Sequence, residues 1–159
     1  IDKISFKEFF WNMFIVDCLI GNTDRHNGNF GFIKNIKTEE LTLAPIYDCG
    51  SCLFSTFTDE KMEEVLKNEG LLRDCIKNTS SAVRYNGSKI KYYDFITKLE
   101  NDDCIEALIR IYPRIDISEI NNIIDDIPCI NDVRKEFYKT IIKYKYEEIL
   151  KFAYKKRKK

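Results

Sequence analysis

Residues 21 to 33 read Gly-Asn-Thr-Asp-Arg-His-Asn-Gly-Asn-Phe-Gly-Phe-Ile, and this stretch says more about the protein than any other. It places an acid, a base, an imidazole, amides and glycines in one short polar segment. An apolar, aromatic-rich segment from Phe6 to Ile20 precedes it, and the apolar residues Phe30 to Ile33 follow. A polar loop between two buried elements is typical of catalytic sites, because the scaffold on either side positions its side chains. The stretch therefore predicts a catalytic loop.

The composition is that of one domain, and we interpret residues 1–159 as a single domain. Hydrophobic residues make up 44% of the chain, which is enough for a buried core. The 26 basic and 26 acidic residues cancel, so there is no direct nucleic-acid signal. No apolar run is long enough for a membrane span. Because the chain opens on Ile1 inside a predicted helix, without an initiator Met, we expect it to be a fragment of a longer protein.

The cysteines give little sign of redox or metal chemistry. Cys49-Gly-Ser-Cys52 has the spacing of a redox motif, but the βαβ pattern that surrounds thioredoxin-type sites is missing. A zinc site is a weaker hypothesis still, since no second cysteine pair follows and His26 is the sole histidine. Most cysteines lie on apolar stripes, which favours free thiols in a reducing, cytoplasmic setting.

The first part of the chain predicts a helix, a loop and a hairpin. Ser5 and Glu8 have capping-box spacing at the start of an apolar helix, and Gly21 is a usual residue just past a helix end. Two strand candidates follow, at 30–34 and 41–46, joined by the turn-prone residues 35–40.

The remainder, residues 58–157, is helical in character. Thr58 caps a predicted helix over 59–67, and Gly70 marks a break before 71–77. Residues 78–91 are interpreted as a loop, with Asn86-Gly87 as a turn. Further helices are expected over 92–99, 103–112 and 118–127, and a long final helix over 131–156. The fold class is therefore mainly α: a helical bundle with one small β-hairpin near the N-terminus.

The chemistry that this order of elements suits is phosphoryl transfer. A carboxylate accepts the proton of the attacking hydroxyl, while an amide five residues later and a second carboxylate hold the metal ions. Asp24 and Asn29 have this spacing, and Asp48 follows the predicted hairpin with Gly50 two residues on, as in the Asp-x-Gly metal site of kinases.

Spacing alone does not identify the site. An Asn follows an Asp by five residues at three other places: Asp17/Asn22, Asp116/Asn121 and Asp126/Asn131. Asp17 lies in the buried-helix pattern, and the other two pairs begin in or beside predicted C-terminal helices. The pair Asp24/Asn29 alone lies in a glycine-flanked loop that a hairpin follows, and this context favours it.

Simpler roles remain open for each residue. Asp24 could be a helix-terminus or turn residue in an ion pair with Arg25 or another base, and Asn29 could hold a left-handed turn. His26 is more often a structural hydrogen-bonding partner than a proton carrier. Arg25 most often makes a stabilising ion pair, and we assign it no chemistry.

The residues Gly21-Asn22-Thr23-Asp24-Arg25-His26-x-x-Asn29-Phe30-Gly31, followed by Leu43-Ala44-Pro45-Ile46-Tyr47-Asp48, resemble the C-terminal part of the HipA-type serine/threonine kinases. These kinases are known mainly as toxins of bacterial toxin–antitoxin pairs. The Asp-Arg-His-x-x-Asn core is also similar to the catalytic loop of phosphatidylinositol 3- and 4-kinases. The motifs cover residues 20 to 50, and the rest matches only in being helical.

The resemblance implies a role at each matching position. Asp24 would be the catalytic base, and Asn29 and Asp48 would bind Mg²⁺ and, through it, ATP. His26 would support the loop or help to neutralise the phosphate. The catalytic loop would be residues 21–31, and residues 46–50 the Asp-x-Gly segment. Nothing before Asp24 resembles the family's N-terminal lobe, which carries the phosphate-covering loop and the ATP-contacting Lys.

We therefore expect the C-terminal lobe of a HipA-like kinase that phosphorylates Ser or Thr of a protein substrate, with an antitoxin-type partner and without activity as an isolated fragment. A lipid kinase lobe of the phosphatidylinositol type is the alternative within the same chemistry. A non-catalytic interaction domain that keeps the kinase fold is the alternative from a different class.

Overall fold

Helix α1 (Phe6–Ile20) forms where the sequence predicts it and organises the structure. Ser5 Oγ accepts a hydrogen bond from the Glu8 backbone N–H at 3.2 Å, which confirms the predicted cap. Gly21 ends the helix with φ 66°, a left-handed conformation that costs glycine little. The residues that α1 buries come from most of its circumference, as expected for a core helix; they are Trp11, Met13, Phe14, Ile15, Asp17, Cys18 and Leu19.

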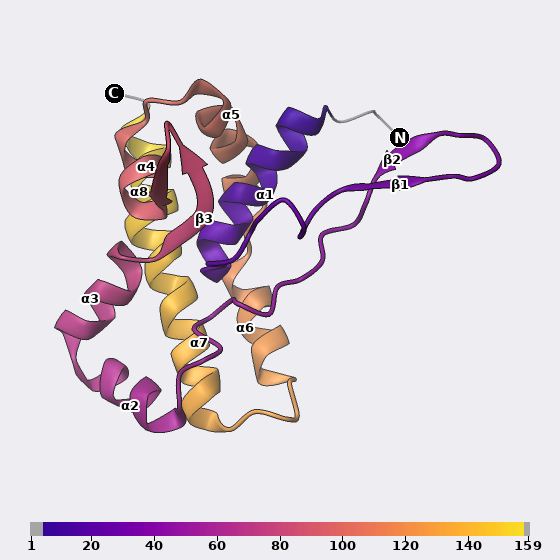
Figure 1. The fold of residues 1–159 in the computed structure, drawn as a ribbon. Coiled ribbons are helices and arrows are strands. Elements are labelled where there is room, and N and C mark those ends of the chain that lie inside the picture. The colour runs from indigo at the N-terminus through magenta and orange to yellow at the C-terminus, as the bar shows by residue number, and fades with distance from the viewer. Residues whose placement is uncertain (1–4, 158–159) are drawn as a thin grey trace.

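The computed structural model describes residues 5–157, and the ends of the predicted domain, residues 1–4 and 158–159, lie outside them. Helices make up most of the described residues, and one long hairpin extends from the helical body (Figure 1). The mainly α fold class is therefore confirmed. After α1, the elements are β1 (Phe32–Lys34), β2 (Leu41–Leu43), α2 (Asp59–Lys67), α3 (Glu69–Lys77), β3 (Ser80–Tyr85), β4 (Ser88–Lys91), α4 (Tyr92–Lys98), α5 (Asp102–Ile111), η1 (Tyr112–Arg114), α6 (Ile117–Asp125), α7 (Asp132–Lys145), η2 (Tyr146–Lys151) and α8 (Phe152–Lys156).

The core lies where α1 meets the later helices. Trp11 of α1 stacks on Phe95 of α4 with ring centroids 5.8 Å apart, and Phe14 contacts Tyr92 at 5.0 Å. Such aromatic pairs contribute beyond the area they bury. The start of α4 is therefore fixed against α1, from which the catalytic loop leaves.

The predicted first hairpin is present. Strands β1 and β2 pair antiparallel with Phe32 opposite Leu43, and they are shorter than the sequence predicts. The prediction of a loop over residues 78–91 is wrong, because β3 and β4 form a second antiparallel hairpin there. Its turn is the predicted Asn86-Gly87, with φ of 49° and 81°. Positive φ at both positions suits the twist of a two-residue hairpin.

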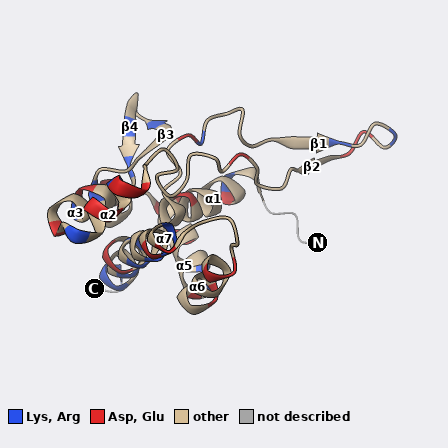
Figure 2. Ribbon diagram, turned by 90° about the horizontal axis from the view of Figure 1, so that it is seen from below, with Lys and Arg blue, Asp and Glu red and all other residues tan. Residues whose placement is uncertain are grey.

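Most predicted helices are observed within one or two residues of their expected ends. The break between α2 and α3 lies at Asn68, whose side chain accepts from the Gly70 and Leu71 N–H groups, and not at Gly70 itself. The long final helix is continuous through α7, a π-helical turn at η2, and α8. None of the helices within residues 5–157 is long and apolar enough to cross a membrane. Acidic and basic residues are interspersed over these helices (Figure 2).

Candidate active site

The entry to the catalytic loop is fixed by Asn22. Its Nδ2 donates to Asp17 Oδ1 at 3.1 Å, and its Oδ1 accepts from the Asp24 backbone N–H at 3.0 Å. Its carbonyl accepts a 2.6 Å hydrogen bond from the Tyr92 hydroxyl, 70 residues further along the chain. Asn22 is fully buried, so each of these bonds is shielded from water. The backbone of Asp24 is therefore held from both α1 and α4.

Arg25 forms a buried ion pair with Asp17. Its Nε lies 2.9 Å from Asp17 Oδ2, and its Nη2 donates to Oδ1 at 3.1 Å. The two side chains are 1% and 2% exposed. Burial alone would lower the pKa of the guanidinium, but the hydrogen bonds and charge of Asp17 outweigh burial and raise this pKa above its ordinary value. The predicted ion pair of Arg25 thus forms with Asp17 and not with Asp24. The carboxylate of Asp24 lies instead 3.8 Å from His26 Nε2.

The same guanidinium joins the catalytic loop to the Asp-x-Gly segment. Arg25 Nη1 donates to the carbonyls of Asn29 and Tyr47, both at 2.7 Å, and Nη2 donates to Cys49 Sγ at 3.5 Å. We refer to Arg25 with Asp17, Asn29, Tyr47 and Cys49 as the Arg25 network. The network holds Asn29 and both neighbours of Asp48, so it fixes the two predicted metal ligands relative to each other.

Asp24 and Asn29 differ in exposure. The Asp24 side chain is 56% exposed, whereas Asn29 is buried. Asn29 Nδ2 donates to the Asp24 carbonyl at 2.8 Å, which leaves the amide oxygen on the opposite side of the group as an acceptor. Asn29 does not have a left-handed backbone, so the hypothesis that it serves a left-handed turn is wrong.

His26 stabilises the loop by a hydrogen bond at the protein surface. Its Nδ1 accepts from the Gly28 N–H at 3.0 Å, so a neutral ring carries its proton on Nε2. This Nε2 lies 3.8 Å from Asp24 Oδ2. A Cβ at position 28 would lie 3.0 Å from His26 Cε1, a tight contact from which the ring would have to shift, so glycine suits this position.

Asp48 follows Tyr47 with a left-handed backbone, φ 54°, and its side chain is exposed. Leu53 and Phe54 are also left-handed, with φ of 51° and 55°. Strained residues of this kind persist where surrounding contacts over-determine them, and they cluster at functional sites. The Tyr47 hydroxyl supplies one such contact, because it donates to the Gly28 carbonyl at 3.0 Å.

The oxygen donors of Asn29 and Asp48 suit a magnesium ion. Within residues 5–157, no group of three or more His, Cys, Asp or Glu side chains is arranged to hold a metal by itself. Magnesium does not require one, since it is usually bound by one or two carboxylates together with substrate phosphates and water. The Asn29 amide oxygen and the Asp48 carboxylate are oxygen ligands that fit this pattern.

Cys52, which lies in the segment after Asp48, is a poorly reactive thiol. All six are free thiols. Burial, followed by the neighbouring Cys49, raises the pKa of Cys52 to about 12. A thiol with so high a pKa forms little thiolate, which is the reactive species.

Sequence reasoning missed two residues that support the site. One is Tyr92, whose hydroxyl donates to the Asn22 carbonyl and which no motif in the sequence singles out. The other is Asp17, which the sequence places only within the buried helix. A carboxylate inside an apolar helix is the signal that could have identified it as a supporting residue, because a buried charge needs a partner.

The helical body, the loop and the hairpin that leads to Asp48 define a kinase-like C-terminal lobe. The chain belongs to the family described as HipA-like C-terminal domain, whose model matches residues 3–127. It is 44% identical over 150 residues to the serine/threonine-protein kinase CtkA of Helicobacter pylori strain J99, covering 93% of this chain and 46% of that protein. It also resembles the crystal structure of a Helicobacter pylori proinflammatory kinase CtkA, with a TM-score of 0.93 and 42% identity over 98% of this chain and 58% of that one. The chain thus spans about half the length of its curated relative.

Proposed function

We propose that this chain is the C-terminal lobe of an ATP-dependent serine/threonine-protein kinase, in which Asp24 is the catalytic base and Asn29 and Asp48 bind Mg²⁺. The observation that carries the proposal is the Arg25 network. One buried guanidinium holds the carbonyl of Asn29 and both neighbours of Asp48, within 2.7 Å of each carbonyl that it contacts. The name of the relative, a serine/threonine-protein kinase, supports the same reading and favours a protein acceptor over a lipid.

Each site residue would have a distinct role in catalysis. Asp24 is exposed, so its carboxylate can reach the acceptor hydroxyl and take its proton. His26 holds the loop through Gly28 and faces the same carboxylate. Asn29 and Asp48 would hold Mg²⁺, which would neutralise negative charge on the phosphates of ATP. The Arg25 network would fix the positions of Asn29 and Asp48 relative to each other before substrate binds. Phosphoryl transfer relies on such preorganisation.

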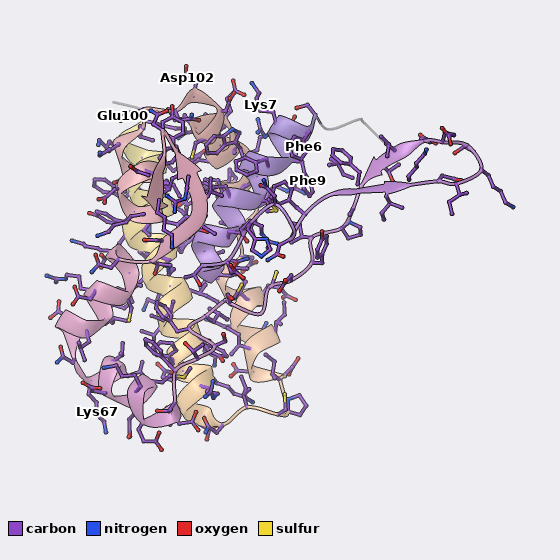
Figure 3. The ribbon with its side chains drawn as sticks, viewed as in Figure 1. Phe6, Lys7, Phe9, Lys67, Glu100 and Asp102 are labelled. Atoms are coloured by element: carbon purple, nitrogen blue, oxygen red, sulfur yellow. The ribbon has the colours of Figure 1, made fainter. Side chains whose placement is uncertain are left out.

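A further lobe of the longer protein would complete ATP binding. Support comes from the β1–β2 hairpin, which extends from the helical body with apolar residues uncovered: Phe32 is 54% exposed, Leu41 63% and Ile36 91%. Phe6, at the start of α1 (Figure 3), contacts Phe32, the first residue of β1, with ring centroids 5.5 Å apart. A two-stranded hairpin is marginal in water unless something packs against it. We therefore expect the isolated chain to bind Mg²⁺–ATP only weakly, with a millimolar or higher Kd, and to be inactive.

The proposal includes a protein substrate, an antitoxin-type partner and a cytoplasmic, bacterial setting. The name of the relative, a serine/threonine-protein kinase, supports the protein substrate. The antitoxin-type partner follows from the resemblance to the HipA-type kinases, and the six free thiols fit a reducing compartment.

Two measurements test the proposal. The full-length protein is incubated with Mg²⁺ and radiolabelled ATP, with casein in one reaction and phosphatidylinositol vesicles in another. Label on casein is expected, whereas label on the lipid alone would favour a lipid kinase. Calorimetric titration of the isolated chain with Mg²⁺–ATP is expected to show millimolar or weaker binding. Absence of transfer to either acceptor by the full-length protein would favour a non-catalytic interaction domain.

A further inference from the structure

A groove lies beside the catalytic loop and has no part in the site described so far. Its volume is about 420 Å³. It is bounded by the catalytic loop, by the end of α3, by the β3–β4 hairpin that the sequence did not predict, and by the segment that follows Asp48. The start of β3 lies beside the end of α1 from which the catalytic loop leaves (Figure 1). The residues that line the groove are Thr23, Phe54, Asp74, Cys75, Asn78, Thr79, Ser80, Ser81 and Lys89.

The groove extends to the residue before the proposed catalytic base. Thr23 lines it and directly precedes Asp24 in the chain. A catalytic base must come within hydrogen-bond distance of the hydroxyl from which it takes a proton. An acceptor segment lying in the groove can therefore present a hydroxyl to Asp24 by continuing past Thr23.

Hydrogen bonds hold the walls of the groove in place. Thr23 Oγ1 donates to the Ser51 carbonyl at 3.5 Å, which ties the catalytic loop to the segment after Asp48. Lys91 Nζ donates to Asn78 Oδ1 at 2.9 Å, which ties β4 to the end of α3. The Tyr92 hydroxyl donates to the Asn22 carbonyl, which ties the residue after β4 to the loop. The groove is thus a built feature of the fold.

The chemistry of the walls suits a peptide. Asp74 and Cys75 of α3, the amide and hydroxyl of Asn78 and Thr79 that follow it, and two serines of β3 line the groove together with the half-buried Phe54. The lining carries one acidic residue, Asp74, and one basic residue, Lys89, so its formal charge is balanced. A polyanionic lipid headgroup or nucleic acid would find no excess of positive charge here, whereas a peptide offers the polar backbone and small apolar groups that such walls accept.

We propose that this groove binds the extended segment of the protein substrate that carries the acceptor Ser or Thr. The inference rests on the proposed function and adds the acceptor site to it. It also gives the β3–β4 hairpin a role, since Ser80, Ser81 and Lys89 of this hairpin line the groove.

The test fills the groove in the full-length protein. Ser80→Trp places a large ring in the groove, and Ser88→Trp is its matched control, because Ser88 is an exposed residue of the same hairpin that does not line the groove. The readouts are KM for casein, KM for ATP and kcat. Ser80→Trp is expected to raise KM for casein about tenfold, and to leave KM for ATP within about twofold. Ser88→Trp is expected to change neither constant.

A charge variant covers the case in which Ser80→Trp does not fold. Lys89→Glu alters an exposed side chain, and it is expected to raise KM for the acidic protein casein, whereas Lys143→Glu on α7 is not. Wild-type transfer with unchanged KM for casein in both groove variants would overturn the acceptor site while the proposed function stands. Failure of the wild-type protein to transfer phosphate would overturn the proposed function itself.

Discussion

Arg25→Met tests whether the Arg25 network holds the site together. The substitution leaves the Asp17 carboxylate, 2% exposed, without its cation, and it removes the donor from the Asn29 and Tyr47 carbonyls. Breaking a buried ion pair by removing one partner costs about 3–5 kcal/mol, because a buried charge is left uncompensated. That is a large part of the 5–15 kcal/mol or so by which a typical domain is stable.

The measurement is urea unfolding of the chain, followed by circular dichroism. Asp17→Leu and the double variant Arg25→Met/Asp17→Leu complete a double-mutant cycle. Because the double variant leaves neither charge buried, it is expected to be destabilised by less than the sum of the single variants, with a coupling energy of about 1–3 kcal/mol. Arg73→Met is the control, since its partner Glu69 is exposed, and its unfolding free energy is expected to stay within about 0.5 kcal/mol of wild type.

Two outcomes would refute the reasoning. If Arg25→Met lowers the unfolding free energy by less than about 1 kcal/mol, the ion pair is not compensating buried charge. If the single effects simply add, Arg25 and Asp17 do not act as a pair. Either result would leave Asn29 and Asp48 without the common support that the proposed function assigns to them.

Three further predictions concern Asp48, Tyr92 and Lys145. Asp48→Gly is expected to keep the unfolding free energy within about 1 kcal/mol of wild type, because glycine relieves the left-handed backbone strain but loses more conformational entropy on folding. The same variant is expected to abolish radiolabel transfer by the full-length protein, and retained transfer would contradict the prediction. Tyr92→Phe leaves the buried Asn22 carbonyl without its donor and is expected to lower the unfolding free energy by about 1–3 kcal/mol, unlike Tyr93→Phe. Lys145 is buried with no hydrogen-bond partner for Nζ, and burial lowers its pKa below the ordinary 10.5. The folded state therefore disfavours the charged amine, so Lys145→Met is expected to stabilise the protein most at low pH, with a gain that shrinks as pH rises toward about 10.5; an equal gain at about pH 6 and about pH 10 would contradict it.

Local signals in the sequence located the first part of the fold. The Ser5 cap, the apolar helix and Gly21 are each decided by neighbouring residues, and all three are observed. The first hairpin and the Asp-x-Gly segment follow from turn and strand patterns over short distances. The polar strands β3 and β4 were missed because Ser, Arg and Lys have weak strand preference, and pairing across the hairpin decides their structure.

The hydrogen bonds that position the candidate site could not be predicted from the sequence, for a different reason. The residues that hold it are far apart in the chain: Arg25 donates to Tyr47, and Tyr92 donates to Asn22. Nothing in the local pattern of Arg25 distinguishes Asp17 from Asp24 as its partner, so the choice is made by the packing of α1 against the loop. The predicted roles of Asp24, His26, Asn29 and Asp48 in catalysis remain predictions.

Asp24→Asn in the full-length protein tests the proposed function most directly. The control is Asp116→Asn, since Asp116 also precedes an Asn by five residues but caps α6, a position that Asn fills equally well. For each variant, the initial rate of radiolabel transfer from ATP to casein is measured, and Tm is measured separately by thermal unfolding. Loss of a catalytic base is expected to lower kcat by about 10²–10⁴-fold without a change in Tm, because the Asp24 side chain is exposed. The Asp116→Asn rate is expected to match wild type. Wild-type turnover by the Asp24→Asn protein would contradict the assignment of Asp24 as the catalytic base.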